Sequence, residues 1–547
     1  MFKDGILYSS YKDDIIPDIE EKTAVEFLLN SVSKVCSKGQ GGKSWLTNVE
    51  TGELCRFDQV ETITRQVASG MFKRGMRSGD ALLYSAHEPT RLHAFILGVW
   101  RANGVTTAAY AEESAATHVA LILESKIKWV ICEPAKASEL LPLLKEQVSW
   151  PVEVICFANP PEGCTSAKDI MEDDGLAFPE FTRNGNDIAA ILPTSGTTGA
   201  SKGTLFSQQT LANIFKAYEM GFYYCDLDRT ITMGRATHIS GFCIPFGILP
   251  AGMQLYSISV VTKQNILESV QRYRPQAFFG FHKFILYLTE PEAEQYDLSS
   301  IEIVSTGGFV ITPSFMKIIN SKLGVGLING YAMTECPSLT STRDYDPTLK
   351  HKLWDDHPDF SVGKLVPRTM LQVRDLDTGA PLGPNQQGEL FFKNNLVCSG
   401  YLNKPEETKN GFPDGWVQTG DVGYFDENGY VFVVDRIKEM FKYITNQISP
   451  SELEGVIQRH PAVSNVCVVG FVDPGGDTVP RAFVTLKDPN ASADEIRRFA
   501  DGQVAPFKKL RGGLIVMHEL PIGKSGKFDR KTLSKIQISI PTELERS

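Results

Sequence analysis

The segment that most constrains this chain is a loop rich in glycines and hydroxyls, PTSGTTGASKG at positions 193–203. The apolar run Ile188–Leu192 leads into the loop, and the short run Thr204–Phe206 leaves it. Glycines let backbone N–H groups turn toward an anion, hydroxyls add donors, and Lys202 adds a point charge. The pattern predicts a strand–loop–strand unit that holds a polyphosphate. It is not a Walker A loop, because Ser201 stands where that motif has its second glycine.

Helix and strand signals alternate on both sides of this loop. Short apolar runs alternate with stretches whose apolar residues are spaced three and four apart. The pattern predicts strands at 81–86, 105–110 and 129–132, and helices at 91–102 and 114–124. Such alternation is typical of an α/β fold with parallel sheets covered by helices. At 547 residues the chain exceeds the size of one core, so we expect more than one domain.

The pattern changes after Leu371. Short strands at 371–375, 388–392 and 430–434 lie among turns and predict a β-rich subdomain within the large N-terminal part. A charged stretch from Asp435 to Glu439 then leads into a compact unit. That unit has a helix from about Pro450, strands near 466–471 and 482–486, and a helix near 493–503. We therefore expect a large domain, residues 1–436, and a small mobile α+β domain, residues 437–547.

Composition and the chain ends narrow the class of protein. The net charge is −10 and no Lys/Arg cluster is dense, which argues against nucleic-acid binding. The ten cysteines have no CxxC pair and no metal-ligand spacing. The N-terminus lacks the apolar core of a signal peptide, no apolar run could span a membrane, and the C-terminus is not a peroxisomal tripeptide. We expect a cytoplasmic enzyme that is a monomer.

Three further motifs carry polar side chains suited to a nucleotide. NGYAMTE at 329–335 offers an aromatic face, a hydroxyl and one carboxylate, and one carboxylate suffices for Mg²⁺ when phosphates supply other ligands. In TGDVG at 419–423, Asp421 is expected to lie in a tight turn and accept both ribose hydroxyls, with Arg436 adding to the grip. Lys527 lies in a glycine-flanked loop near the C-terminus. Taken alone, each motif is compatible with an ordinary strand end or a surface loop.

Together and in this order, the four segments resemble the adenylate-forming family of acyl-CoA synthetases, coumarate-CoA ligases and beetle luciferases. The similarity runs from about Val25 to Ile536 and includes SVGKLVP at 361–367, SGY at 399–401 and KLRGG at 509–513. It implies that Tyr331 stacks on adenine and that Glu335 binds Mg²⁺. The implied ATP-binding residues are Thr194, Ser195, Gly196, Thr197, Thr198, Gly199, Lys202, Gly307, Gly308, Asn329, Gly330, Tyr331, Ala332, Thr334, Asp421 and Arg436.

The resemblance also implies the catalytic residues. Lys527 would bridge the acyl carboxylate and the α-phosphate, and Thr334 would contact the α-phosphate. His238 would border the acyl pocket, although a lone histidine is more often structural. Lys442 occupies the position that luciferases use in their second, oxidative step. The small domain would rotate about a hinge near Lys438, withdrawing Lys527 and admitting CoA.

These residues predict an enzyme that uses ATP and Mg²⁺ to convert a carboxylic acid into an acyl-adenylate, with release of pyrophosphate. CoA would then take the acyl group as a thioester, and the acid would be a medium-chain fatty acid or an aromatic acid. The alternative is a luciferase-type monooxygenase, in which O₂ replaces CoA as second co-substrate. A non-catalytic descendant that only binds ligands is disfavoured by the retained Lys202, Glu335 and Lys527.

The loop after the hinge departs from the family pattern. Ile444 stands where the family usually has lysine, and Thr445 stands where it usually has glycine. A β-branched threonine resists dihedral angles that glycine adopts freely, and the loss of lysine removes a cation near the entering thiol. Two interpretations are open: CoA transfer is slow or altered while adenylation is intact, or the loop tolerates both residues.

Overall fold

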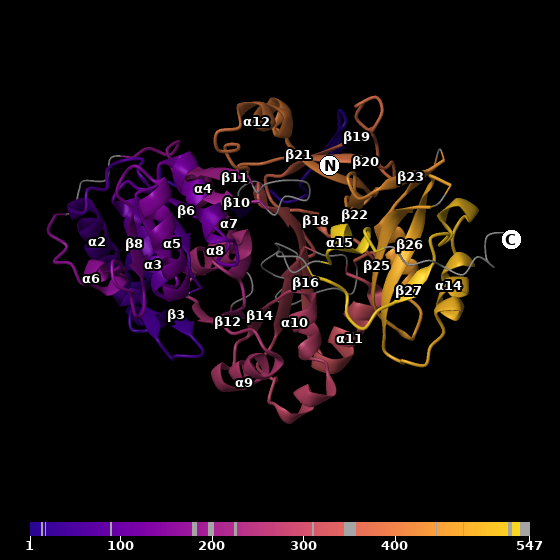
Figure 1. Ribbon diagram of the computed structural model, residues 1–547, viewed down its shortest axis with the longest axis horizontal. Coiled ribbons are helices and arrows are strands. Elements are labelled where there is room, and N and C mark those ends of the chain that lie inside the picture. Colours follow the sequence, from indigo (N-terminus) through magenta and orange to yellow (C-terminus); the bar gives the residue numbers. More distant parts are fainter. Residues whose placement is uncertain are drawn as a thin grey trace.

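The computed structural model describes residues 1–536 apart from short internal segments (Figure 1). The segments left out are 13–14, 17, 88–89, 178–182, 195–201, 224–226, 309–310, 344–356, 445, 474 and 523–527. Within the described residues, a large N-terminal domain contains three sheets and a small C-terminal domain contains two. The predicted α/β fold with a small C-terminal domain is confirmed. No helix of this described part is long and apolar enough to cross a membrane.

One large sheet has seven strands in the order β11-β10-β6-β5-β7-β8-β9. The strands are β5 (Ala81–Ser85), β6 (Val105–Ala108), β7 (Trp129–Cys132), β8 (Glu153–Cys156), β9 (Thr165–Ser166), β10 (Ile188–Pro193) and β11 (Gly203–Ser207). The connecting helices are α3 (Arg91–Arg101), α4 (Ala115–Ser125), α5 (Pro134–Gln147) and α6 (Ala167–Met171), and α7 (Gln208–Tyr223) follows β11. All neighbouring strands are parallel except β10 and β11, which form a hairpin. The elements predicted between 81 and 132 are confirmed, with ends that differ by no more than two residues.

A second large sheet has nine strands in the order β18-β17-β16-β15-β14-β12-β13-β3-β4. The strands are β3 (Ser44–Asn48), β4 (Leu54–Arg56), β12 (Arg229–Thr232), β13 (Gln254–Ser257), β14 (Ala277–Phe279), β15 (Ile303–Gly307), β16 (Gly326–Met333), β17 (Cys336–Ser341) and β18 (Lys364–Leu365). Its helices include α8 (Ile239–Ile248), α9 (Lys263–Tyr273), α10 (His282–Tyr287) and α11 (Pro313–Leu323). The strands from β3 to β16 in this order are parallel. Their carboxyl ends therefore share one edge, where ligands of such sheets bind.

The third sheet is antiparallel and has six strands in the order β1-β2-β19-β20-β21-β22. The strands are β1 (Phe2–Lys3), β2 (Ile6–Tyr8), β19 (Met370–Arg374), β20 (Gly388–Lys393), β21 (Val417–Phe425) and β22 (Val431–Arg436), and α12 (Pro405–Gly411) lies between β20 and β21. The expected tight turn at Asp421 was wrong: Asp421 lies inside β21 and pairs with Arg436 of β22. Gly420 (φ +71°) takes the left-handed conformation within the strand, so the Thr-Gly-Asp signal marks an irregular strand instead of its end.

The small domain follows β22 and occupies the yellow end of Figure 1. Its elements are β23 (Phe441–Tyr443), β24 (Asn446–Ile448), α13 (Pro450–Ile457), β25 (Val463–Val472), β26 (Thr478–Leu486), α14 (Ala493–Asp501), β27 (Leu514–Val516) and α15 (Arg530–Leu533). Leu453 of α13, Val484 of β26 and Ile496 of α14 are fully buried in a core of this domain's own residues. An independent core is what allows a domain to move as one body.

One cluster of buried hydrophobic residues contains side chains from all three sheets of the large domain. Trp45 of β3, Leu82 of β5 and Phe392 of β20 all belong to it and are fully buried. Trp100 of α3 packs against the rings of Phe215, Phe242 and Phe246 from α7 and α8. Because this core joins the sheets, their strand ends hold fixed positions relative to one another, as a site assembled from several strands requires.

Candidate active site

The glycine-rich loop is closed at its base by the hairpin of β10 and β11. The backbone N–H of Thr194 donates to the carbonyl oxygen of Lys202 at 2.8 Å. The N–H of Lys202 donates in return to Thr194 Oγ1 at 3.2 Å. The predicted residues Ser195, Gly196, Thr197, Thr198 and Gly199 lie outside the described residues. The two ends of the predicted phosphate loop are thus held together at the edge of the seven-stranded sheet.

Lys202 points toward Glu407 of α12 and Tyr401 of the segment before α12. Its Nζ lies 2.5 Å from Glu407 Oε2 and 4.7 Å from the ring centroid of Tyr401. The hydrogen bond from Lys202, with one from Lys404, lowers the pKa of Glu407 below its usual value. The strand edge brings these residues close, because Leu402 N–H donates to Gly203 O at 2.8 Å. A carboxylate and an aromatic face thus hold this cation.

Tyr401 also reaches the predicted magnesium ligand. Its hydroxyl donates to Glu335 Oε1 at 2.7 Å, and Glu335 lies in the turn between β16 and β17, with 9% of its surface exposed. Burial, and then the charge of Glu335, raise the pKa of Tyr401, so the phenol keeps its proton and orients the carboxylate. No group of three or more His, Cys, Asp or Glu residues in the described chain could hold a metal by itself. One oriented carboxylate beside a phosphate loop fits a Mg²⁺ ion that is also held by substrate phosphates.

The carboxyl ends of β15 and β16 form a surface made largely of backbone. Gly307 pairs with Gly330, and a Cβ at Gly307 would meet the carbonyl oxygen of Gly330 at 2.8 Å. Asn329 is 1% exposed. Its Oδ1 atom and the Oγ1 atom of Thr306 are buried and have no hydrogen-bond partner in the described chain. Buried polar atoms are rarely left unpaired, so unpaired ones at a sheet edge fit a missing polar ligand. A nucleotide base with ring nitrogens and an amino group has the required chemistry.

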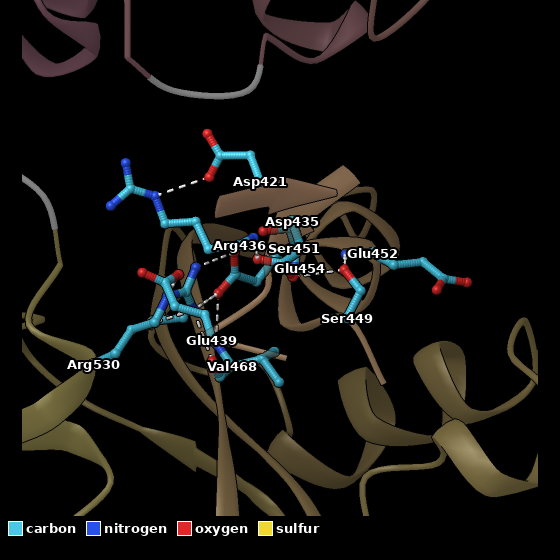
Figure 2. Close-up of polar contacts among 11 residues, drawn as sticks. Asp421, Asp435, Arg436, Glu439, Ser449, Ser451, Glu452, Glu454, Val468 and Arg530 are labelled. Carbon is cyan, nitrogen blue, oxygen red and sulfur yellow. Dashed lines mark hydrogen bonds and ion pairs between the residues drawn. The ribbon is translucent and has the colours of Figure 1, made fainter. Parts of the chain in front are cut away.

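Tyr331, Asp421 and Arg436 come together from three strands. The Tyr331 hydroxyl donates to Asp421 Oδ2. Arg436 Nε lies 3.2 Å from Asp421 Oδ1 (Figure 2). Burial raises the pKa of Tyr331 well above its usual value, and the Asp421 charge adds to this effect. Asp421 is only 5% exposed and is held between a donor and a cation. The predicted adenine and ribose residues therefore lie in direct contact.

The remaining large-domain residues lie along the same edge. His238 follows β12 and caps α8: its Nδ1 lies 2.9 Å from Ser240 Oγ and accepts the Ser240 N–H at 3.3 Å. The His238 ring stands edge-on to Phe281, with centroids 5.9 Å apart. Gly308 (φ +83°) follows β15, while Ala332 is exposed and Thr334 half-buried beside Glu335. His238 has a local structural role that is compatible with bordering a pocket.

The small-domain residues are only partly described. Lys527 lies outside the described residues, but Ile522 and Phe528 pair across the base of its loop. Lys442 is exposed on β23, opposite Gln447 of β24. These two lysines therefore lie on the small domain, whereas the predicted nucleotide residues up to Arg436 lie on the large one.

Two residues of the site were missed by sequence reasoning: Tyr401 and Glu407. The segment SGY at 399–401 did stand out as similar to the family, but nothing in it indicates a partner. Its position beside Lys202 comes from the pairing of Tyr401 with Thr204, two residues far apart along the chain. Contacts of that kind carry no signal in local sequence patterns.

Comparisons with known proteins agree with this geometry. Residues 37–402 match the family model described as AMP-binding enzyme, and residues 452–527 match its C-terminal domain. A 4-coumarate–CoA ligase of Petroselinum crispum is 29% identical over 93% of this chain and 92% of its own. A luciferin 4-monooxygenase of Photuris pensylvanica is 25% identical over 90% of this chain and 91% of its own.

Among solved structures, ATP-bound MatB from Rhodopseudomonas palustris superimposes with a TM-score of 0.81 at 24% identity, covering 92% of this chain and 98% of that one. At that identity the match shows the fold alone. The family models, which span most of both domains, carry the assignment. The chain belongs to the adenylate-forming family of AMP-binding enzymes.

Proposed function

We propose that this protein is an acid–CoA ligase that uses ATP and Mg²⁺ to activate a medium-chain fatty acid or an aromatic acid. The observation that carries the proposal is the placement of two clusters on neighbouring sheet edges. The first cluster, made of Tyr331, Asp421 and Arg436, suits an adenosine. The second cluster, in which Tyr401 contacts both Lys202 and Glu335, suits a triphosphate with its metal. The coumarate-CoA ligases among its relatives favour the aromatic acid.

The proposed chemistry needs charge neutralisation more than proton transfer. A carboxylate oxygen attacks the α-phosphorus of ATP and pyrophosphate leaves, so an anion must approach an anion. Lys202 would hold the outer phosphates, Thr334 the α-phosphate, and Lys527 the developing charge between acid and phosphate. Mg²⁺, held by Glu335, would supply further neutralisation of the phosphates. No general acid–base pair is required.

We also propose residues 1–436 and 437–547 as the two functional domains, with a hinge near Lys438. Rotation of the small domain would remove Lys527 after adenylation and open a path for CoA. The independent core of the small domain supports this division.

The direct test is a screen for pyrophosphate release with a panel of straight-chain and aromatic carboxylic acids. We expect acid-dependent release that requires Mg²⁺, followed by an acyl-CoA thioester when CoA is present. Absence of pyrophosphate with every acid, while ATP still binds in calorimetry, would overturn the proposed function.

Glu407→Gln is expected to tighten ATP binding. The triphosphate must displace Glu407 from Lys202, and since this ion pair is partly exposed and screened by solvent, its removal is expected to raise the affinity no more than about fivefold. Isothermal titration calorimetry with Mg·ATP measures the change directly. Glu406→Gln removes the same charge from the exposed neighbouring residue and is the matched control. Equal affinity in the two variants would contradict the prediction.

A second candidate function keeps adenylation and replaces CoA transfer by an oxygen-dependent or hydrolytic step. Ile444 motivates it: this β-branched residue has φ +58° and is 69% exposed in the connection between β23 and β24. A left-handed conformation is rare for such residues and costs about 1–3 kcal/mol. Strained residues cluster at functional segments, and this one lies where the family has its lysine.

The second step is tested on preformed acyl-adenylate in single-turnover experiments. If this candidate holds, Ile444→Lys with Thr445→Gly is expected to raise the rate of thioester formation about tenfold, equivalent to roughly 1.4 kcal/mol, and to leave adenylation unchanged. Fast CoA-dependent thioester formation by the unmodified enzyme would reject the candidate and leave the ligase. Light emission or acid release without CoA would support it.

A further inference from the structure

The loop that carries Lys527 is fixed at its base. Ile522 and Phe528 form an antiparallel bridge, and the Asp529 N–H donates to Pro521 O at 2.8 Å. Asp529 Oδ1 then accepts the Thr532 N–H at 3.0 Å and caps α15. Arg530, the first residue of α15, comes three positions after Lys527. A contact that fixes the position of Arg530 therefore also fixes the C-terminal end of this loop.

Arg530 binds three separate elements (Figure 2). Its guanidinium makes a two-pronged contact with Glu454 of α13, in which Nη1 faces Oε1 and Nη2 lies 3.0 Å from Oε2. Nη1 also donates to Val468 O of β25 at 2.7 Å. Nε lies 2.9 Å from Glu439 Oε2. Glu454 and Val468 already accept hydrogen bonds from Nη1 and Nη2 of the guanidinium. Glu439, which faces Nε, is therefore an additional partner from outside the domain core.

Glu439 lies in the turn that joins the two domains. Its N–H donates to Arg436 O at 2.9 Å, and the Met440 N–H donates to the same oxygen at 3.0 Å. Arg436 itself holds Asp421. One series of contacts thus runs from Asp421 through the turn to Glu439 and Arg530, and so from the proposed ribose site to the loop of Lys527.

The neighbouring contacts anchor α13 to the same turn. Asp435 Oδ2 accepts the Ser449 hydroxyl at 2.6 Å and the Ser451 N–H at 2.9 Å, at the start of α13 (Figure 2). α13 also carries Glu454. The helix that binds the inner side of Arg530 is therefore itself capped by the last strand of the large domain.

We propose that Arg530 is a positioning residue, which through Glu439 fixes Phe528 and Asp529, the described residues directly after Lys527, relative to the turn that carries Arg436. The inference rests on the proposed function, because it requires Lys527 to act in adenylation. The Glu454 contact joins α15 to α13 within the small domain, and both side chains are largely buried, with 26% of Arg530 and 18% of Glu454 exposed. Glu439 contacts only Nε of the guanidinium, so its loss leaves the two-pronged contact with Glu454 in place.

The test combines Glu439→Gln with Lys527→Ala in the full-length enzyme. Alone, Glu439→Gln is expected to lower the turnover of pyrophosphate release about tenfold, with unchanged KM for ATP and unchanged melting temperature. In the Lys527→Ala background it is expected to have no further effect, because there is no lysine left to position. Glu439→Asp keeps the charge and is expected to restore part of the rate.

Glu452→Gln is the matched control. Glu452 lies on the same helix α13 but pairs with Lys508 at 2.6 Å, away from Arg530, so full activity is expected. Hydrogen exchange gives a readout that does not depend on turnover: the peptide containing residues 523–527 is expected to exchange faster in Glu439→Gln than in Glu452→Gln.

Three outcomes overturn the inference. These are an unchanged turnover in Glu439→Gln, an equal loss in both backgrounds, or a loss that follows a lower melting temperature. Failure of the proposed function has a different signature, since Lys527→Ala would then release pyrophosphate at the normal rate.

Discussion

Lys527→Ala is expected to slow acyl-adenylate formation by about 10²–10³-fold, the usual effect of removing one positioned donor that stabilises developing charge. ATP binding and folding should remain, because Ile522, Phe528 and Arg530 make the contacts that hold the described residues on either side of this loop. Pyrophosphate release in single-turnover experiments measures the first effect, and calorimetry with ATP measures the second.

The control for this prediction is the other lysine of the same loop. Lys524→Ala removes an equal charge three residues earlier and is expected to retain most of the activity. Loss of activity of similar size in the two variants would mean that the net charge of the loop matters, and that Lys527 has no specific role.

Asp421→Ala is expected to weaken ATP binding on the order of 30-fold or more, which corresponds to about 2 kcal/mol. The substitution removes the acceptor expected to hold the ribose hydroxyls. It also leaves Tyr331 and Arg436 without the buried carboxylate that they share. The melting temperature should therefore fall as well, because the Tyr331 hydroxyl loses its acceptor and Arg436 loses its ion-pair partner.

Calorimetry and thermal melting test this prediction together. Glu427→Ala serves as the control, because Glu427 is an exposed carboxylate in the turn between β21 and β22. An Asp421→Ala protein that binds ATP as tightly as Glu427→Ala would exclude Asp421 from the nucleotide site.

Local patterns located many of the helices and strands of the fold. Apolar runs such as Trp129–Cys132 and the helical spacing in Arg91–Arg101 depend on residues a few positions apart, so periodicity located them well. The N-terminal strands β1 and β2 escaped notice. They are short, and they gain their place by joining β19 from the far end of the domain.

The same distinction applies to the site. Lys202, Glu335 and Asp421 were predicted as site residues because they belong to compact motifs, but the contacts that they make were not predicted. Tyr401 reaches Glu335 through the tertiary fold, and the hydrogen bond of Tyr331 with Asp421 depends on how two sheets meet. Arg530 was visible only as part of a basic loop, since its acidic partners Glu439 and Glu454 lie on other elements.

Tyr401 has a thermodynamic consequence for the order of ligand binding. One side chain contacts both Lys202, the proposed phosphate ligand, and Glu335, the proposed metal ligand. If a triphosphate at Lys202 changes the orientation of this ring, it also changes the position of the Glu335 carboxylate that would bind Mg²⁺. Binding of Mg²⁺ must then change the free energy of triphosphate binding by the same amount. ATP and Mg²⁺ are then expected to raise each other's affinity by one common factor through the protein, in addition to their mutual attraction in solution. Tyr401→Phe keeps the ring beneath Lys202 and breaks the hydroxyl link, so it would reduce that factor toward the value set by the phosphates alone.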